Sequence, residues 1–349
     1  MIGSIVHAWE RRLAAVDTNR RVRPFQWGLN WLDVEPGRPP AAEVEPPVDD
    51  AAAREQLLAW SRAVMAETDR FYTAPRLGDY EYRDQVLRFP SAIVTPETAN
   101  NTVEARVFEP APDRRAGPRR AVVVMAQWNA DRDGHVGLCR LFARFGLTAV
   151  RLSLPYHDNR KPPDLERADL IVSPNVGRTA QINRQAVLDV RRIVDWLETQ
   201  GMARIGIMGT SLGSCLAMLA MAHDPRIRAG AFNHVSPYFA DVVWRGLSTK
   251  HVRAGLDGHI SLDDLRECWM PISPWPFIDR VRDRAVRLIY ARYDLSFPID
   301  LSREFVAEFR RRAVPHSTTV LPCGHYTTGK APFKYLDGYA LTKFLVTRL

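Results

Sequence analysis

The feature that most constrains the fold is a repeated alternation of apolar strand-like runs with helical stretches, which begins after Arg120. Residues 121–125 form a continuous apolar run, which is typical of a strand covered on both faces. Helical patterns then alternate with further strand-like runs at residues 148–154, 204–208, 227–232, 285–290 and 317–321. This alternation predicts an α/β fold with a mainly parallel central sheet and helices on both faces.

The first 84 residues lack this alternation, and we expect them to form a helical N-terminal extension. A helical stretch runs to about residue 16, and a proline-rich segment follows it between Pro36 and Pro47. Residues 50–71 then show apolar side chains at helical spacing, with Asp49 or Asp50 available as the N-cap. Neither stretch carries a motif of its own, so the extension is expected to pack on a body formed by residues 85–349.

Two segments modify the alternating pattern. Residues 86–94 and 103–108 are strand-like and are separated by a turn-prone stretch, which predicts an antiparallel hairpin at a sheet edge. Residues 237–276 lie between two predicted strands and are irregular in pattern and rich in Trp and His. We interpret this stretch as an inserted lid.

The charge of the chain does not identify a partner. In 349 residues, 48 Lys and Arg exceed 40 Asp and Glu, which gives a formal net charge of +8. The basic residues are interspersed with acidic ones, and no nucleic-acid-binding module accompanies them. We therefore expect a solvated surface and no nucleic-acid partner.

Targeting and metal-binding patterns are also missing from the sequence. The N-terminus reaches charged residues before an apolar core of signal-peptide length, and no stretch is apolar enough to span a bilayer. We therefore expect a cytoplasmic protein without stable membrane insertion. The four cysteines form no C-x-x-C pair, and the histidines show no H-E-x-x-H spacing. Neither a metal nor another cofactor is predicted, and a homodimer stays open.

The sharpest chemical signal is the pentapeptide Gly209-Thr210-Ser211-Leu212-Gly213. It directly follows a strand-like run and opens a helical stretch. A nucleophile elbow needs small neighbours of this kind, so that a strained serine can project its hydroxyl above the sheet. The alternative is a plain glycine-containing turn in which Ser211 caps the helix.

A serine hydroxyl needs a base to take its proton, and the base needs an acid to orient it. Asp294 and His325 each follow a strand-like run further along the chain. Either residue alone could belong to an ordinary turn or loop, but together they complete the chain order Ser, Asp, His. We predict a catalytic triad of Ser211, Asp294 and His325, with Asp300 as the substitute acid.

In these contexts the triad residues resemble the α/β-hydrolase superfamily over roughly residues 86–349. A narrower resemblance, to the α/β-hydrolase domain-containing protein 18 family, rests on residues 154–162, on the end of a long helix at 195–198 and on residues 206–213. The resemblance implies the α/β-hydrolase fold and a serine hydrolase that cleaves carboxylic esters through an acyl-enzyme. Because the superfamily also contains lyases and inactive relatives, a lyase that uses the same triad and a non-catalytic ligand receptor or scaffold stay open.

The oxyanion hole is expected to use two backbone N–H groups. One belongs to Leu212, directly after the nucleophile, and the other to the loop that follows the strand at 121–125. That loop reads Ala-Gln-Trp-Asn at residues 126–129, without the His-Gly pair of the commonest pattern. Gln127 or Trp128 is therefore the expected second donor.

Contacts to a small-molecule ester substrate are suggested by residue type alone. Aromatic residues that could line an apolar acyl pocket beneath the lid, or instead pack the lid onto the body, are Trp128, Tyr238, Trp244 and Trp269. Arg160 and Lys161 follow a strand on the side where such folds bind ligands. They could meet an anionic group, or form salt bridges with Asp158, Asp164 or Glu166. Asn129 is a further candidate contact.

Overall fold

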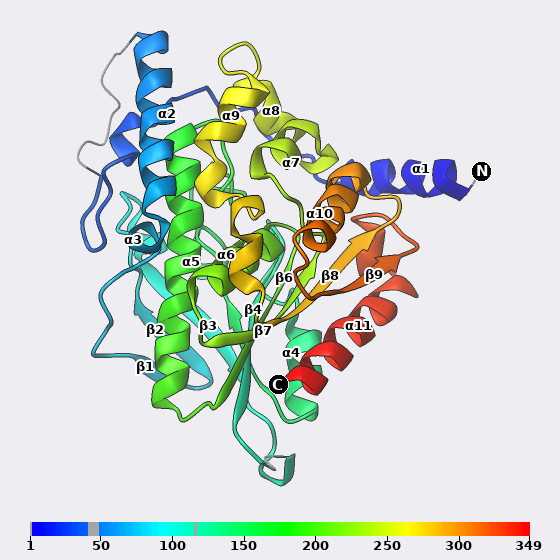
Figure 1. The fold of residues 1–349 in the computed structure, drawn as a ribbon. Helices are drawn as coiled ribbons and strands as arrows, with labels where there is room; N and C mark the ends of the chain where they lie inside the picture. Colours follow the sequence, from blue (N-terminus) through cyan, green and yellow to red (C-terminus); the bar gives the residue numbers. More distant parts are fainter. Residues whose placement is uncertain (1, 41–48, 115–116) are drawn as a thin grey trace.

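The computed structural model describes residues 2–40, 49–114 and 117–349, and the strands among these residues form one sheet (Figure 1). The sheet has the order β1-β2-β3-β5-β4-β6-β7-β8-β9. The pairs from β5 across to β9 are parallel, whereas β1–β2, β2–β3 and β3–β5 are antiparallel. The strands are β1 (Glu81–Arg83), β2 (Val86–Pro90), β3 (Thr102–Phe108), β4 (Arg120–Met125), β5 (Thr148–Leu152), β6 (Arg204–Thr210), β7 (Ile227–Asn233), β8 (Ala285–Ala291) and β9 (Ser317–Leu321).

Apolar side chains on successive residues of β4 enter two different cores. Val122 and Val124 belong to one buried cluster, and Val123 and Met125 belong to the other. Because both faces are covered, the strand has no polar position, and the predicted mainly parallel sheet with helices on both faces is confirmed. The covering helices are α4 (Val136–Arg144) and α11 (Phe333–Arg348) on one face, and α5 (Val176–Thr199), α6 (Leu212–His223) and α10 (Ile299–Arg311) on the other (Figure 1).

The N-terminal segments comprise α1 (Ile2–Ala14), η1 (Leu29–Trp31), α2 (Asp50–Ala66) and α3 (Thr68–Phe71). They pack on two different parts of this body, with α1 at the side of α10, β8 and β9 and with α2 against α9 (Leu262–Cys268) (Figure 1). Asp49 is the N-cap of α2 and accepts a hydrogen bond from the backbone N–H of Ala52. The helix expected over residues 50–71 is divided in two, because Glu67 leaves the helical backbone with φ −131°. Among the described helices, none is both long enough and apolar enough to cross a membrane.

The stretch at residues 237–276, whose sequence pattern is irregular, is largely helical in the structure. It contains α7 (Phe239–Arg245), α8 (Lys250–Leu256) and α9 (Leu262–Cys268). Each of these helices has only seven residues, so their apolar periodicity covers about two turns and is hard to detect in the sequence. Buried Leu265 and Val252 join them to the main core.

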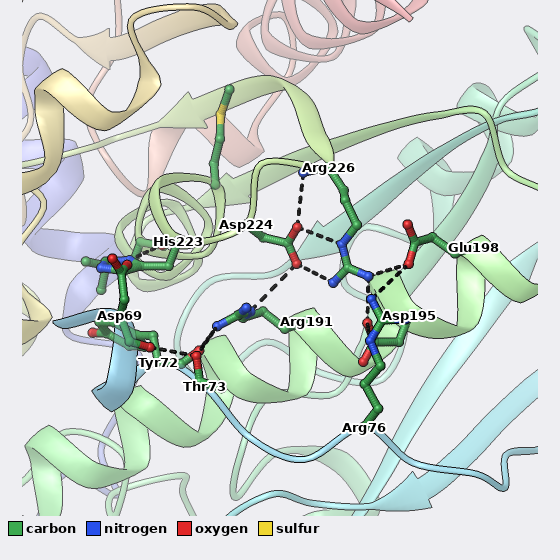
Figure 2. Close-up of polar contacts among 12 residues, drawn as sticks. Asp69, Tyr72, Thr73, Arg76, Arg191, Asp195, Glu198, His223, Asp224 and Arg226 are labelled. Atoms are coloured by element: carbon green, nitrogen blue, oxygen red, sulfur yellow. Dashed lines mark hydrogen bonds and ion pairs between the residues drawn. The ribbon is translucent and has the colours of Figure 1, made fainter. Parts of the chain in front are cut away.

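Charged side chains hold the segment after α3 against α5 and the turn between α6 and β7 (Figure 2). Asp224 is fully buried and accepts hydrogen bonds from the Arg226 guanidinium at 2.6 and 2.8 Å. Asp224 also faces Arg191 of α5 at 3.7 Å, and the Arg191 guanidinium donates to the carbonyl of Tyr72. Arg226 also pairs with Asp195 of α5 at 2.6 Å, so three chain segments meet around one buried carboxylate.

This network predicts that Asp224→Asn destabilises the protein. The substitution leaves two guanidinium groups without their buried carboxylate, and breaking such a pair costs about 3 kcal/mol of unfolding free energy. Urea denaturation measures the loss. Glu55→Gln is the control, because the Glu55–Arg62 pair is exposed on both sides and spans 3.7 Å, and its loss should cost less than about 0.5 kcal/mol. Equal costs for the two variants would contradict a central role for Asp224.

Candidate active site

Ser211 occupies a sharp turn between β6 and α6, with φ 57° and ψ −123°. Its glycine neighbours permit a close approach of the backbone: a Cβ on Gly209 would lie 2.0 Å from the carbonyl oxygen of Gly213, and a Cβ on Gly213 would lie 2.4 Å from that of Ala126. The Ser211 side chain forms no capping hydrogen bond to α6. Strain, small neighbours and an uncapped hydroxyl are features of a nucleophile elbow and not of a helix N-cap.

Three further side chains come from the carboxyl ends of neighbouring parallel strands. His234 directly follows β7, Asp294 follows β8 and His325 follows β9. The Oδ2 atom of Asp294 accepts a hydrogen bond from Nδ1 of His325 at 2.9 Å and another from Nδ1 of His234 at 2.7 Å. Oδ1 accepts from the backbone N–H groups of Ser296 and Phe297 at 2.8 and 2.7 Å. Since an ionised carboxylate only accepts, each ring is assigned a proton on Nδ1, and a neutral ring presents Nε2 as an acceptor.

These contacts shift the pKa values of the three groups in different directions. Burial alone would raise the pKa of Asp294, but the His325 charge and the hydrogen bonds from both rings hold this pKa well below its ordinary value. Burial alone would lower the pKa of His325, but the Asp294 carboxylate raises it above its ordinary value. Burial and the neighbouring His325 charge lower the pKa of His234. The carboxylate therefore stays ionised, and His325 is the ring that takes up a proton more readily.

A cavity of about 1180 Å³ lies beside these residues. Ser211, His234 and His325 all line it. Among the described residues, the Ser211 hydroxyl has no hydrogen-bond partner, so Ser211 and His325 share the cavity without a hydrogen bond between them. Such bonds are often long in unliganded enzymes and tighten when substrate binds. Charges of both signs surround the cavity, on Asp17, Arg20, Arg132, Asp133, Lys161, Arg167, Lys334 and Asp337.

The loop at residues 126–129 borders the cavity next to the Ser211 turn. Within the described chain, the backbone N–H groups of Leu212, Gln127 and Trp128 donate no hydrogen bond, whereas the N–H of Asn129 donates to Nε2 of His157 at 2.9 Å. Oδ1 of Asn129 accepts from the backbone of Ala168, but its Nδ2 is buried at the cavity without a partner. The loop therefore offers free donors from Gln127 or Trp128, and a side-chain donor from Asn129.

Three of the proposed substrate contacts lie away from the cavity, which corrects the expectation for them. Arg160 is 1% exposed and pairs with Asp189 of α5 at 2.9 Å, so it forms a buried structural ion pair, with a partner distant in the sequence. Tyr238 packs its ring against Trp275, and Trp244 lies under the guanidinium of Arg253. Both aromatic side chains therefore pack against residues of the stretch 237–276 itself, and sequence spacing does not show these contacts.

The other expected residues have varied environments. Trp269 is fully buried in the core, where its Nε1 donates to the carbonyl of Val176. Trp128 and Lys161 line the cavity. Asp300 is exposed and pairs with Arg245 at 2.7 Å, so it is a surface residue that does not contact His325.

Two residues of the site were missed by sequence reasoning. His234 directly follows a strand, as Asp294 and His325 nearly do, and this position is the signal that could have identified it. Asp337 lies on α11, lines the cavity and accepts a hydrogen bond from the Asn233 amide at 2.9 Å. Burial raises the pKa of Asp337 to about 7. The helical pattern of α11 does not indicate a site residue at this position, because Asp337 reaches the cavity only through the packing of α11 beside β7.

Comparison with known proteins agrees with this geometry at the level of the fold. Residues 137–242, which include Ser211 and His234, match the model of the family described as alpha/beta hydrolase domain containing 18. The acylaminoacyl peptidase of Pyrococcus horikoshii is similar with a TM-score of 0.59 and 16% identity, over 78% of this chain and 42% of that protein's chain. A puromycin-hydrolyzing peptidase of Mycobacterium tuberculosis is similar with a TM-score of 0.56 and 17% identity, over 71% of this chain and 37% of its own.

An esterase of Pyrococcus furiosus is matched over nearly its whole length, with a TM-score of 0.51 and 15% identity, over 79% of this chain and 97% of that esterase. By contrast, the chain spans less than half the length of the two peptidases. At these identities the likeness concerns the fold. The chain therefore has the α/β-hydrolase fold and, over residues 137–242, resembles the family of alpha/beta hydrolase domain containing 18.

Proposed function

We propose that this protein is a serine hydrolase that cleaves carboxylic esters through an acyl-enzyme, with Ser211, His325 and Asp294 as its triad. The observation that carries the proposal is the hydrogen bond from His325 Nδ1 to the buried Asp294 carboxylate, beside the strained Ser211 turn in one cavity. A His–carboxylate pair next to a serine of this geometry is the arrangement that activates a hydroxyl nucleophile.

In the proposed mechanism, the Ser211 oxygen attacks the ester carbonyl and its proton passes to Nε2 of His325. Backbone N–H groups of Leu212 and of Gln127 or Trp128 stabilise the oxyanion. Collapse of the tetrahedral intermediate breaks the ester C–O bond, and the alcohol leaves with the proton from His325. Water then attacks the acyl-enzyme carbonyl while Nε2 of His325 takes one of its protons. Cleavage of the bond between the acyl carbon and the Ser211 oxygen releases the acid, and His325 returns the proton to that oxygen.

His325 is proposed as the base in preference to His234 because of exposure and charge. The side chain of His325 is 12% exposed and that of His234 is 1% exposed. The pKa of His325 is raised from its ordinary value, whereas that of His234 is lowered. His234 is proposed to hold the Asp294 carboxylate from the second side, so His234→Phe should reduce turnover less than His325→Ala does.

Covalent labelling tests the nucleophile. A fluorophosphonate probe should label the wild-type protein, and Ser211→Ala should abolish the labelling, because the neighbouring Thr210 hydroxyl is already hydrogen-bonded to the His135 ring at 2.8 Å. Ser302→Ala is the control, since this buried serine of α10 donates to the Val235 carbonyl and does not line the cavity. In-gel fluorescence measures the result. Labelling that persists in Ser211→Ala would contradict the assigned nucleophile.

Labelling combined with an ester-cleavage assay on the same protein distinguishes the remaining candidate functions. Folded wild-type protein that is never labelled would favour a ligand receptor or scaffold. Labelled protein that leaves p-nitrophenyl esters of every chain length intact would favour a lyase, or an enzyme that acts on amides. Release of p-nitrophenol in proportion to labelled protein is the outcome expected for an ester hydrolase.

The pH profile tests the base. His325 must be neutral to accept the serine proton, and its pKa lies above the ordinary value of 6.5, so kcat/KM should fall as the pH drops through a midpoint above 6.5. Asp294→Asn removes the charge that raises this pKa. It should move the midpoint to lower pH and reduce kcat by about 10⁴-fold, the scale known for loss of a triad carboxylate.

Asp337 titrates in the same range, because its pKa is raised to about 7. The variant Asp337→Asn shows which group causes the fall of kcat/KM at low pH, here called the acidic limb. If His325 causes it, the acidic limb should persist in Asp337→Asn. Disappearance of the limb in Asp337→Asn, with the limb unchanged in Asp294→Asn, would contradict the assignment to His325.

A further inference from the structure

The loop that carries His325 is held by a residue near the other end of the chain. Glu10 of α1 is fully buried. Its Oε2 accepts a hydrogen bond from the backbone N–H of Tyr326 at 2.9 Å, and its Oε1 accepts from the N–H of Thr327 at 2.8 Å and from the Thr327 hydroxyl at 2.8 Å. The Glu10 side chain therefore binds the two residues that directly follow His325.

Gly324, the residue before His325, also lies directly against the Glu10 carboxylate. A Cβ on Gly324 would lie 2.3 Å from Cδ of Glu10, so only glycine allows the carboxylate to come so close. The N–H of Gly324 donates to the Thr327 hydroxyl at 2.7 Å, and that hydroxyl donates to Glu10. Hydrogen bonds to an ionised carboxylate are roughly twice as strong as those between neutral groups. Glu10 thus fixes the backbone on both sides of His325.

The segment around Glu10 reaches the rest of the site as well. His7 of α1 packs its ring edge-on against Tyr293, the residue before Asp294, with centroids 6.0 Å apart. Arg20, which follows α1, donates to the Tyr326 hydroxyl at 2.9 Å and lines the cavity. Figure 1 shows α1 at the side of the molecule where α10, β8 and β9 lie. One N-terminal segment therefore contacts the Asp294 loop, the His325 loop and the cavity.

We propose that Glu10 is a positioning residue for the general base, and that α1 contributes to the active site through this side chain. The inference rests on the proposed function, since positioning of His325 matters to turnover only if His325 is the base. Glu10 touches neither the reacting atoms nor the His325 ring. It acts through the backbone at Tyr326 and Thr327, which sets where the ring lies relative to Ser211.

The charge of Glu10 also contributes to the electrostatics of the site. Burial lowers the pKa of His325, and the Asp294 carboxylate and, more weakly, Glu10 raise it. The titratable groups that contact or act on the ring from the surrounding elements are Asp294, His234, Tyr326 and Glu10. Loss of the Glu10 charge should therefore lower the pKa of His325, which a purely architectural contact would leave unchanged.

The decisive variant is Glu10→Gln, which keeps the shape of the side chain but replaces one acceptor oxygen with an amide group that cannot accept. It should reduce kcat by about 10²-fold, the cost of a misplacement of about 1 Å in a catalytic group, with KM nearly unchanged. The acidic limb of kcat/KM should move to lower pH. Arg11→Gln is the control, because it changes one charge on an exposed neighbour in the same turn of α1 and should keep wild-type kcat and pH profile.

A second measurement covers the case in which the variant folds poorly or the esterase proposal fails. Amide hydrogen exchange at Tyr326 and Thr327 should be at least about tenfold faster in Glu10→Gln than in the wild type or in Arg11→Gln, as expected when a local hydrogen bond is lost. Unchanged exchange would overturn the contact itself. A lower melting temperature with wild-type kcat, KM and pH limb would overturn the positioning role. Wild-type protein that a fluorophosphonate never labels would instead defeat the proposed function, while the exchange result would still test the contact.

Discussion

The Asp294 carboxylate keeps its charge although it is almost closed to solvent, and the remainder of the candidate site depends on it. Two backbone N–H groups and two imidazole Nδ1 atoms donate to its oxygens, so each oxygen accepts twice. A buried carboxylate is stable as an anion only with such a complete set of donors. The carboxylate in turn holds the His325 ring by its Nδ1 atom, and its charge raises the pKa of that ring.

The parallel sheet explains why these groups meet. Neighbouring strands β6, β7, β8 and β9 end at one edge, and the residues that follow them supply Ser211, His234, Asp294 and His325. Gly209 and Gly213 let the Ser211 turn lie close to the end of β4, which brings the loop at 126–129 beside it. The N-terminal helix α1 adds the Glu10 carboxylate, which accepts hydrogen bonds from the two residues after His325.

Much of the fold could be predicted from the sequence, because buried parallel strands leave continuous apolar runs. The apolar run at 121–125 corresponds to β4 almost to the residue, and the β-branched stretch at 317–321 corresponds to the partly buried edge strand β9. The placement of Ser211, Asp294 and His325 after strands was visible for the same reason. Contacts that depend on tertiary packing could not be predicted from the sequence. Arg160 pairs with Asp189 on α5, and Glu10 binds a loop more than three hundred residues away. A local sequence pattern does not indicate partners this distant, and helices α7, α8 and α9 are too short for their periodicity to be recognised.

A crystal structure of the protein after reaction with a small phosphonate ester tests the triad most directly. The phosphorus should be bonded to Oγ of Ser211, with Nε2 of His325 within about 2.6–3.2 Å of a phosphonyl or Ser211 oxygen. The phosphonyl oxygen should face the N–H of Leu212. An adduct on another residue, or a His325 ring turned away from Ser211 while still bound to Asp294, would contradict the catalytic roles assigned to these residues.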